Sequence, residues 1–287
     1  MKYPKIPIIF VTAAMTMPTL AFAEEEELPF DEAQLYFELN DTDGDLGIHG
    51  KVDGDAWKRV KIEAPNERKL LVIRARSKLA RQGMTELFFE SSEPTFDELN
   101  PEDFFDRFPE GVYEWEGLTT EYEEIEGEVY LSQRIPAAPV VSSVGNNDAP
   151  AAGECWDPGD VAEVVISWNP VTETHASLGS DTGAPLGNNS VIYYEFVAEI
   201  DGTEFKSTAL VPPDTNSWTV SEEFILMAEG ITVEDEDTGI EEPVEEIKFE
   251  IIVRVETGEY EEVDDDEIEI VNSRPGNQSA VESCFEI

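Results

Sequence analysis

Beyond residue 24 the chain repeatedly alternates hydrophobic and polar positions over short stretches, which is the pattern of half-buried β-strands. In the stretch 34–39, Leu35, Phe37 and Leu39 fall on one face. The first block of predicted strands comprises residues 34–39, 57–62, 70–75, 85–90, 112–117 and 125–131. The second block comprises residues 161–168, 191–200, 205–211, 217–220, 247–255 and 278–287. The pattern therefore predicts an all-β protein.

One helix is predicted within the first block, over residues 100–108. Asn100 is a capping residue, Pro101 takes the first helical position, and two acids follow it. Three phenylalanines then form an apolar stripe before Pro109 ends the helix. We therefore expect residues 24–134 to form a β-sandwich domain with one short helix.

The second block begins after a proline-rich stretch at 134–139, which suits a short, stiff linker. Loops rich in Gly, Pro, Asp and Asn separate its strands, as in a Greek-key sandwich. The segments IPAAPVV, VVISWNPV with Trp168, TNSWTV with Trp218, and FEIIVRVET together resemble a fibronectin type III domain. The resemblance covers residues 135–287 and implies a second, immunoglobulin-like sandwich with Trp168 in its core.

This block departs from the fibronectin type III pattern in two ways. Phe249 stands where that family often has a tyrosine that braces a corner of the fold. The block is also longer than the roughly 100 residues of such a sandwich, and long acidic loops account for the excess.

The first block carries a separate resemblance. Its segments LNDTDGDLGIHGKVDG, GMTELFFESSEP and FPEGVYEWEG resemble the leading part of uncharacterised secreted bacterial proteins that carry a fibronectin type III domain behind it. That resemblance implies an exported two-domain protein and adds no activity.

Residues 1–23 read as a secretory signal peptide. Lys2 and Lys5 precede an apolar run, and Ala21 and Ala23 form a small-residue cleavage site. Acidic residues 24–27 end the apolar segment, and no later run reaches about 18 apolar residues. We expect a secreted protein, periplasmic or extracellular, without membrane insertion.

The charge balance is strongly acidic, with 65 Asp and Glu against 18 Lys and Arg and a formal net charge of −47. Such a chain repels nucleic acid and anionic lipid, so neither is an expected partner. Salt screens carboxylate repulsion, and a halophilic or marine bacterium is the simplest source of such acidity. Hydrophobic content of 40% excludes a wholly disordered chain.

Basic residues concentrate between residues 51 and 81, against the acidity of the whole. Either they pair with the protein's own carboxylates or they bind an anionic ligand such as an acidic polysaccharide. The candidate residues for an anionic ligand are Lys58, Arg59, Arg74 and Arg76.

The segment Asp41-Thr42-Asp43-Gly44-Asp45 carries the sharpest local motif. Asp41, Asp43 and Asp45 fall at positions one, three and five of a turn, where carboxylates can converge on Ca²⁺. Leu46 and Val52 replace the glycine and the glutamate that an EF-hand requires at positions six and twelve. A simpler calcium loop and a solvated turn remain the two interpretations, and Ca²⁺ is the one cofactor candidate.

Catalytic motifs are missing from the sequence. The two histidines, His49 and His175, have no metal-ligand spacing, and neither a G-x-S-x-G elbow nor a phosphate loop occurs. We therefore expect a protein that is not an enzyme, with a glycoside hydrolase as the least favoured alternative.

Cys155 and Cys284 are the only cysteines. Export places them in an oxidising compartment, and they flank the second sandwich near its first and last strands. We expect them to form a disulfide, with two free thiols as the alternative.

These observations together predict a secreted, highly acidic binding or structural protein of the cell envelope or extracellular space. Its partner is a protein or a polysaccharide. A carbohydrate-binding or calcium-dependent accessory module is the alternative, and Trp57, Trp115 and Trp156 are the candidates for a sugar-stacking row.

Overall fold

The computed structural model describes residues 28–287 except 146, 148, 149, 152, 160, 188, 189, 235–238, 265 and 266. Between 257 and 275 it describes the backbone alone. The predicted signal peptide, residues 1–23, lies outside the described residues.

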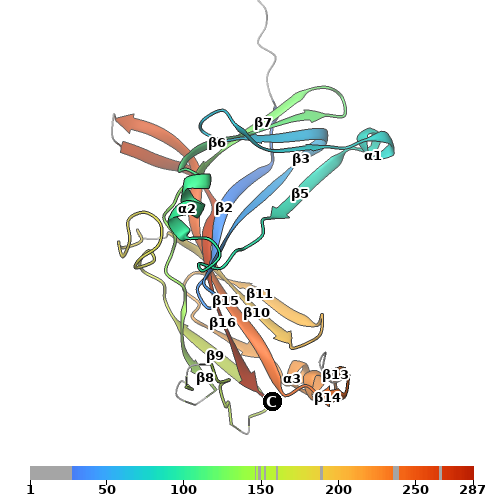
Figure 1. Ribbon diagram of the computed structural model, residues 1–287, viewed down its shortest axis with the longest axis vertical. Coiled ribbons are helices and arrows are strands. Elements are labelled where there is room, and N and C mark those ends of the chain that lie inside the picture. The colour runs from blue at the N-terminus through green and yellow to red at the C-terminus, as the bar shows by residue number, and fades with distance from the viewer. Residues whose placement is uncertain are drawn as a thin grey trace, which may run out of the picture.

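The N-terminal half is built around one long, bent strand, β3. Its elements are β1 (Leu28–Pro29), β2 (Glu32–Asn40), β3 (Asp45–Glu63), β4 (Lys69–Arg74), α1 (Ser77–Gln82), β5 (Met84–Glu90), α2 (Pro101–Arg107), β6 (Gly111–Thr119) and β7 (Glu124–Leu131). The first half of β3 pairs with β2 and β5, and its second half pairs with β6 and β4 (Figure 1). The bend turns one strand into the corner of two layers, which enclose a core.

That core is apolar, and the predicted helix closes one side of it. Phe104 and Phe105 of α2 pack edge-on against Phe37 of β2, with ring centroids 5.7 and 5.4 Å away. Asn100 caps α2 by accepting a hydrogen bond from the Glu102 backbone N–H at 2.8 Å. The half contains a second helix, α1, that the sequence pattern did not predict, because its six residues bury no side chain and carry no apolar stripe.

The C-terminal half is a seven-stranded sandwich. Its strands are β8 (Val140–Val144), β9 (Val164–Asn169), β10 (Val191–Ile200), β11 (Lys206–Val211), β12 (Ser217–Val220), β15 (Glu246–Asp264) and β16 (Glu267–Glu286). One sheet has the order β12-β9-β8, and the other has the order β16-β15-β10-β11. This three-plus-four arrangement confirms the predicted all-β class and the fibronectin type III-like sandwich.

The sandwich core follows the predicted alternation. Trp168 of β9 is 1% exposed and packs against Tyr194 and Phe196 of the facing sheet. Phe249 is buried in β15, and the bracing hydroxyl comes instead from Tyr194, which accepts a hydrogen bond from the Val171 backbone N–H at 2.9 Å.

A helix and a small hairpin lie between β12 and β15, where the sequence analysis expected only a long acidic loop. The helix is α3 (Glu222–Glu229), and the hairpin pairs β13 (Thr232–Glu234) with β14 (Glu241–Pro243). Ser221 caps α3, and Glu222 and Glu223 favour its first turn. Ser221 followed by two acids was therefore a sequence signal for a helix, and it was missed because the segment reads as part of an acidic loop.

One sheet of 11 strands runs through both halves. Strand β16 pairs antiparallel with β15 in the sandwich and parallel with β2 through Gln278, Ser279 and Ala280. Figure 1 shows β15 and β16 extending from the sandwich past β2 into the N-terminal half. The halves are thus hydrogen-bonded together through a shared sheet.

Two buried side chains of β16 fix the connection between the halves. Asn277 accepts a hydrogen bond from the Phe37 backbone N–H at 2.9 Å and donates to the carbonyls of Ser132 and Arg134 at 2.7 and 3.0 Å. Ser279 donates to the Pro136 carbonyl at 2.6 Å. The linker predicted at 134–139 is therefore held against the shared sheet.

Candidate functional site

One face of the shared sheet carries polar side chains where it crosses from one half to the other. The opposite face of β2 points Leu35, Phe37 and Leu39 into the N-terminal core. The strand registers place the following side chains on the other face, which we call the polar face: Gln34, Tyr36, Glu38, His49, Lys51, Tyr193, Glu195, Glu250, Arg254, Gln278 and Glu282.

Arg254 anchors the middle of the polar face. It is 5% exposed, and its guanidinium lies 3.5 Å from the centroid of the Tyr36 ring. It donates to the side-chain oxygens of Gln278 and, at 3.0 Å, of Gln34. A buried guanidinium needs such partners because desolvating an unpaired charge is costly.

Histidine 49 lies between two carboxylates at one end of this network. Its Nδ1 is 3.1 Å from Glu38, and its Nε2 is 3.1 Å from Glu93, in the loop after β5. Gln278 also donates to the Glu38 carboxylate. The chain of contacts from Arg254 through Gln278 and Glu38 to His49 joins strands of both halves.

Carboxylates outnumber cations around this end of the polar face. Burial raises the pKa of Glu250 to about 8, and the nearby Glu38, Glu282, Glu195 and Glu93 add to the rise. The surrounding negative charge therefore disfavours the ionisation of further carboxyl groups at this end of the polar face.

The same excess extends to the start of β3. Burial raises the pKa of Asp45 to about 6, with Glu93, Asp43 and Glu282 contributing. This end of the polar face therefore favours positive charge, either as protons or as cations.

The predicted calcium residues lie at the β2–β3 turn, next to this cluster. Asp41 contacts His175 at 3.2 Å, across the two halves. Asp43 lies 3.4 Å from the Asn40 amide, and Asp45 is already part of β3. Among the described residues the three carboxylates do not form a group with oxygens within 4.8 Å of one another. The calcium loop stays a prediction.

The predicted basic site lies on the outer surface of β3 and β4. Arg59 and Arg74 are directly opposite in the β3–β4 register, and Arg76 occupies the N-cap position of α1 without a capping hydrogen bond from its side chain. Within the described parts of the chain none of these three arginines has an ion pair, whereas Lys58 lies 2.9 Å from the centroid of the Tyr122 ring. The fold brings two of the four candidates side by side, and an anionic ligand there stays a prediction.

Other lysines of the basic window do pair with the protein's own carboxylates. Lys51 contacts Glu32 at 2.7 Å, and Lys61 contacts Glu116 at 2.6 Å and Glu63 at 3.0 Å. Lys51 and Lys61 are thus paired within the fold, whereas Arg74 and Arg76 are exposed and Arg59 is half-buried.

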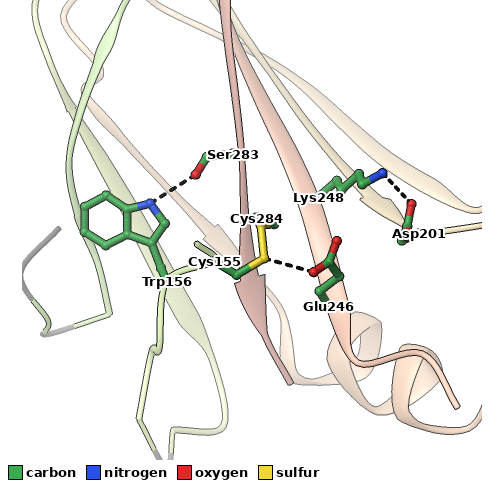
Figure 2. Close-up of a disulfide and its surroundings, with 7 residues drawn as sticks. All are labelled: Cys155, Trp156, Asp201, Glu246, Lys248, Ser283 and Cys284. Carbon is green, nitrogen blue, oxygen red and sulfur yellow. Dashed lines mark hydrogen bonds and ion pairs between the residues drawn. A yellow bond between two sulfur atoms is a disulfide. The ribbon is translucent and has the colours of Figure 1, made fainter. Parts of the chain in front are cut away.

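The predicted disulfide is present between Cys155 and Cys284, with Cα atoms 4.7 Å apart. Figure 2 shows it tying the loop after β8 to β16, beside Trp156, whose ring N–H donates to Ser283 at 3.1 Å. Glu246 of β15 lies 2.9 Å from the Cys155 sulfur. The bridge ties this loop to β16 two residues beyond Glu282 of the polar face.

The tryptophans proposed for sugar stacking are core residues. Trp57 and Trp115 are fully buried in the N-terminal core, and Trp156 is 4% exposed in the sandwich core. The expected solvent-facing row is therefore not built from them, because their large apolar area is better used in packing.

Sequence reasoning did not find the polar face. Gln34, Tyr36 and Glu38 alternate with the apolar residues of β2, and that alternation normally indicates a solvated face. Arg254 stands within the apolar run IKFEIIVRV, where an isolated charge is a signal of a buried partner.

Fold and site together define an all-β protein of two cores joined by one sheet, with a fibronectin type III-like sandwich as its C-terminal half. No family model matches the chain, and no curated protein matches it. Among solved structures, it is similar to the FN1-FN3 domains of chicken CNTN1, with 12% identity and a TM-score of 0.25, covering 91% of this chain and 70% of that one.

A second solved structure is the BSP domain of a biofilm associated protein. The identity is 14% and the TM-score 0.23, over 88% of this chain and 29% of that one. Of the helices that the structure describes, none has the length and apolarity that crossing a bilayer requires.

Proposed function

We propose that this chain is an exported, acidic binding or structural protein of the cell envelope or extracellular space, acting without catalysis. In this proposal residues 24–134 form its N-terminal domain and residues 135–287 its fibronectin type III-like domain. A protein or a polysaccharide is the partner.

The polar face is the observation that carries this proposal. Its charged and aromatic side chains are held in place by hydrogen bonds within a rigid sheet, so binding a partner would cost little ordering entropy. Arg254 in its middle and His49 at one end are both buried, while Phe88 at its margin is 53% exposed. Fixed polar groups beside an exposed aromatic ring are typical of a recognition surface.

Export is supported by two features. The disulfide between Cys155 and Cys284 is stable in an oxidising compartment. The acidic surface, at a net charge of −47, keeps such a protein dispersed in salt-rich surroundings.

Arg59, which is half-buried, and Arg74, which is exposed, give a second surface for a polyanionic partner. Arg59 and Arg74 are like charges directly opposite each other, an arrangement that destabilises a strand pair unless an anion lies between them. An acidic polysaccharide would supply carboxylate or sulfate groups of the required charge.

A capture experiment tests both surfaces. Immobilised mature protein, residues 24–287, is incubated with the envelope fraction of its own source, and bound proteins and sugars are identified. Two variants are compared with it: Tyr193→Ala with Glu195→Gln on the polar face, and Arg59→Gln with Arg74→Gln on the basic surface. Glu128→Gln, on β7 away from both, is the control.

We expect one partner to be recovered by the parent and the control and to be lost from one of the two variants. Loss from the arginine variant identifies a polyanion, and loss from the polar-face variant identifies the sheet surface. Recovery of the same material by all four proteins would refute a specific binding role.

A further inference from the structure

A cavity of about 360 Å³ lies at the junction of the two halves. One wall comes from the ends of β6 and β7 and from the linker, and the other comes from the loop after β9 and from β15 and β16. We call it the junction pocket. Cavities of this size between domains are common binding sites for small molecules.

Backbone hydrogen bonds hold both walls of the junction pocket. In the loop after β9, the Ser180 N–H donates to the Gln133 carbonyl of the linker at 2.8 Å. On the opposite side, the Glu256 N–H of β15 donates to the Ser190 carbonyl at 2.8 Å. Figure 1 shows the loop beside the segment that connects the halves. A ligand would therefore enter a preformed cavity at a small cost in conformational entropy.

Glu110 provides a fixed hydrogen-bond acceptor. The Tyr130 hydroxyl donates to one of its carboxylate oxygens, and the Gln133 backbone N–H donates to the other, both at 2.8 Å. A carboxylate accepts about four hydrogen bonds in all. Glu110 is thus held in place by the protein and can still accept from a ligand.

Arg134 provides donors on the opposite side of the linker turn. Its carbonyl accepts a hydrogen bond from Asn277 at 3.0 Å, which fixes its backbone. Its buried Nε lies 3.3 Å from the Asp181 carboxylate but forms no hydrogen bond with it. Within the described part of the chain the guanidinium makes no other hydrogen bond or ion pair. Since a guanidinium has five N–H donors, Arg134 retains donors for a ligand.

Asp181 reaches this position through an unusual backbone conformation. Its φ of 52° lies in the left-handed region, which residues other than glycine seldom adopt. The Ala184 N–H donates to its carbonyl at 3.0 Å and closes the turn. Such conformations gather at ligand-binding sites. The result is a carboxylate and a guanidinium side by side at the rim of the junction pocket.

The chemistry of the lining matches hydroxyl groups. A hydroxyl both donates and accepts, so it can bridge an adjacent carboxylate and guanidinium. Sugars carry such hydroxyls on neighbouring carbons, and their C–H groups can pack on apolar walls such as Leu186 and Val255. Three carboxylates, Glu110, Asp181 and Glu256, stand against one guanidinium, which disfavours an acidic sugar.

A second hollow extends the space available to a ligand. It has a volume of about 640 Å³ and shares Leu186 and Ser190 with the junction pocket. Pro170, Pro185 and Pro213 line it. A chain of several sugar rings therefore fits this region better than a single ring.

We propose that the junction pocket binds a neutral polysaccharide, with the hydroxyls of one sugar ring hydrogen-bonded to Arg134, Asp181 and Glu110. This inference rests on the proposed binding role and names a ligand class for it. The site is separate from Arg59 and Arg74, which suit a polyanion.

Isothermal titration calorimetry on the mature protein, residues 24–287, tests the site. The probes are five neutral trisaccharides: maltotriose, cellotriose, xylotriose, mannotriose and triacetylchitotriose. Trigalacturonate is the acidic probe and spermidine the cationic one. Salt at about 0.3 M screens diffuse attraction to the acidic surface. We expect at least one neutral trisaccharide to bind with a Kd of about 1 mM or tighter.

Arg134→Met removes the donors and keeps an apolar stem. It should weaken the binding of that trisaccharide about tenfold, the effect of losing a hydrogen bond to a charged group. Arg68→Met is the matched control, because Arg68 is an exposed arginine in the turn before β4. It should bind as the parent does.

Asp181→Asn keeps the test open if Arg134→Met fails to fold, because asparagine tolerates the left-handed backbone. It should also weaken binding, while thermal unfolding shows that the variant is folded. Equal affinity in the parent and in a folded pocket variant would overturn the proposal. Binding of spermidine or trigalacturonate alone, or of none of the probes, would also overturn it.

Arginine NMR gives a direct readout in the parent. With ¹⁵N-labelled arginine, the bound trisaccharide should shift the Nε–H signal of Arg134 and leave that of Arg68 in place. Shifts at Arg68 alone, or at neither, would contradict the site. Because these probes are purified sugars, a failed titration leaves the capture result standing, and a failed capture leaves the titration standing.

Discussion

The two halves of this protein bury their strands differently. In the C-terminal sandwich, the inner faces of two sheets meet in an apolar core around Trp168 and Phe196. In the N-terminal half, β2 is buried on both faces, with apolar residues on one and Gln34, Tyr36 and Glu38 on the other. The core of the sandwich follows strand alternation, whereas the N-terminal half also depends on a set of polar partners supplied by β15 and β16.

The difference between the halves shows which contacts fix the strand register. Apolar packing tolerates a range of shapes, but a buried polar group tolerates only a register that gives it partners. Slipping β16 by one residue against β2 would turn Gln278 to the opposite face and leave Arg254 and Glu38 without it. The polar face therefore fixes how the halves are joined.

The largest effect is expected from the disulfide, which belongs to the sandwich alone. Cys155→Ser with Cys284→Ser opens a loop of 129 positions, and the chain-entropy account assigns such a loop just under about 5 kcal/mol of unfolding free energy. Because the sheet is shared, amides of β2 and β3 should lose hydrogen-exchange protection together with those of β9 and β10.

Hydrogen exchange by mass spectrometry measures that coupling. Loss of protection confined to the sandwich would mean that the halves unfold independently. The parent, denatured without reductant, should also show no titratable thiol.

Asn277 tests the junction itself. Asn277→Ala removes three hydrogen bonds and leaves the buried N–H of Phe37 without its acceptor, at a cost of about 3 kcal/mol in urea unfolding. Asn66→Ala, which removes one hydrogen bond in an exposed turn, is the control and should cost under about 1 kcal/mol. Equal losses would show that the junction carries no special share of the stability.

The polar face should make stability depend on pH. The pKa of Glu250 is about 8 in the fold against an ordinary value of 4.5, so the folded state binds more protons than the unfolded one between these values. Stability should then fall as pH rises from about 4.5 to 8. The carboxylates Glu38, Glu93, Glu195 and Glu282 face Glu250 and cause part of this repulsion.

Glu250→Gln should remove much of that slope and stabilise the protein at pH 8 by on the order of 3 kcal/mol. Denaturation in urea across the pH range measures it. Glu128→Gln on the opposite half is the control and should leave the slope unchanged. A slope that is the same in Glu250→Gln and the parent would contradict this account of the polar face.

The smallest effect is expected at the β2–β3 turn. Binding Ca²⁺ through Asp41, Asp43 and Asp45 would require Asp41 to leave His175. We therefore expect the Ca²⁺-specific gain in unfolding free energy, relative to Mg²⁺, to be under about 0.5 kcal/mol. The test is thermal unfolding of the parent and of Asp43→Asn with each ion at matched ionic strength. A larger Ca²⁺-specific gain in the parent that disappears in the variant would establish the calcium loop.

Local sequence signals determined much of this protein. Alternation located the strands of the sandwich other than β8, Asn100 and Pro101 located α2, and the two cysteines indicated their own pairing. These features can be predicted from the sequence because the strands and the helix cap depend on neighbouring residues, and the disulfide follows from there being only two cysteines. The core positions of Trp168 and Phe37 follow from the same periodicity.

Only the tertiary structure decided the rest. Alternation cannot tell a solvated polar face from one whose side chains bury each other across neighbouring strands that are far apart in the sequence. The contacts of Arg254, Gln278 and His49 were therefore not readable. The bend of β3 and the parallel pairing of β16 with β2 also join segments far apart in the sequence. The physical reason is that a buried polar group is stabilised by the partners it meets, and those partners are set by sheet register rather than by local sequence.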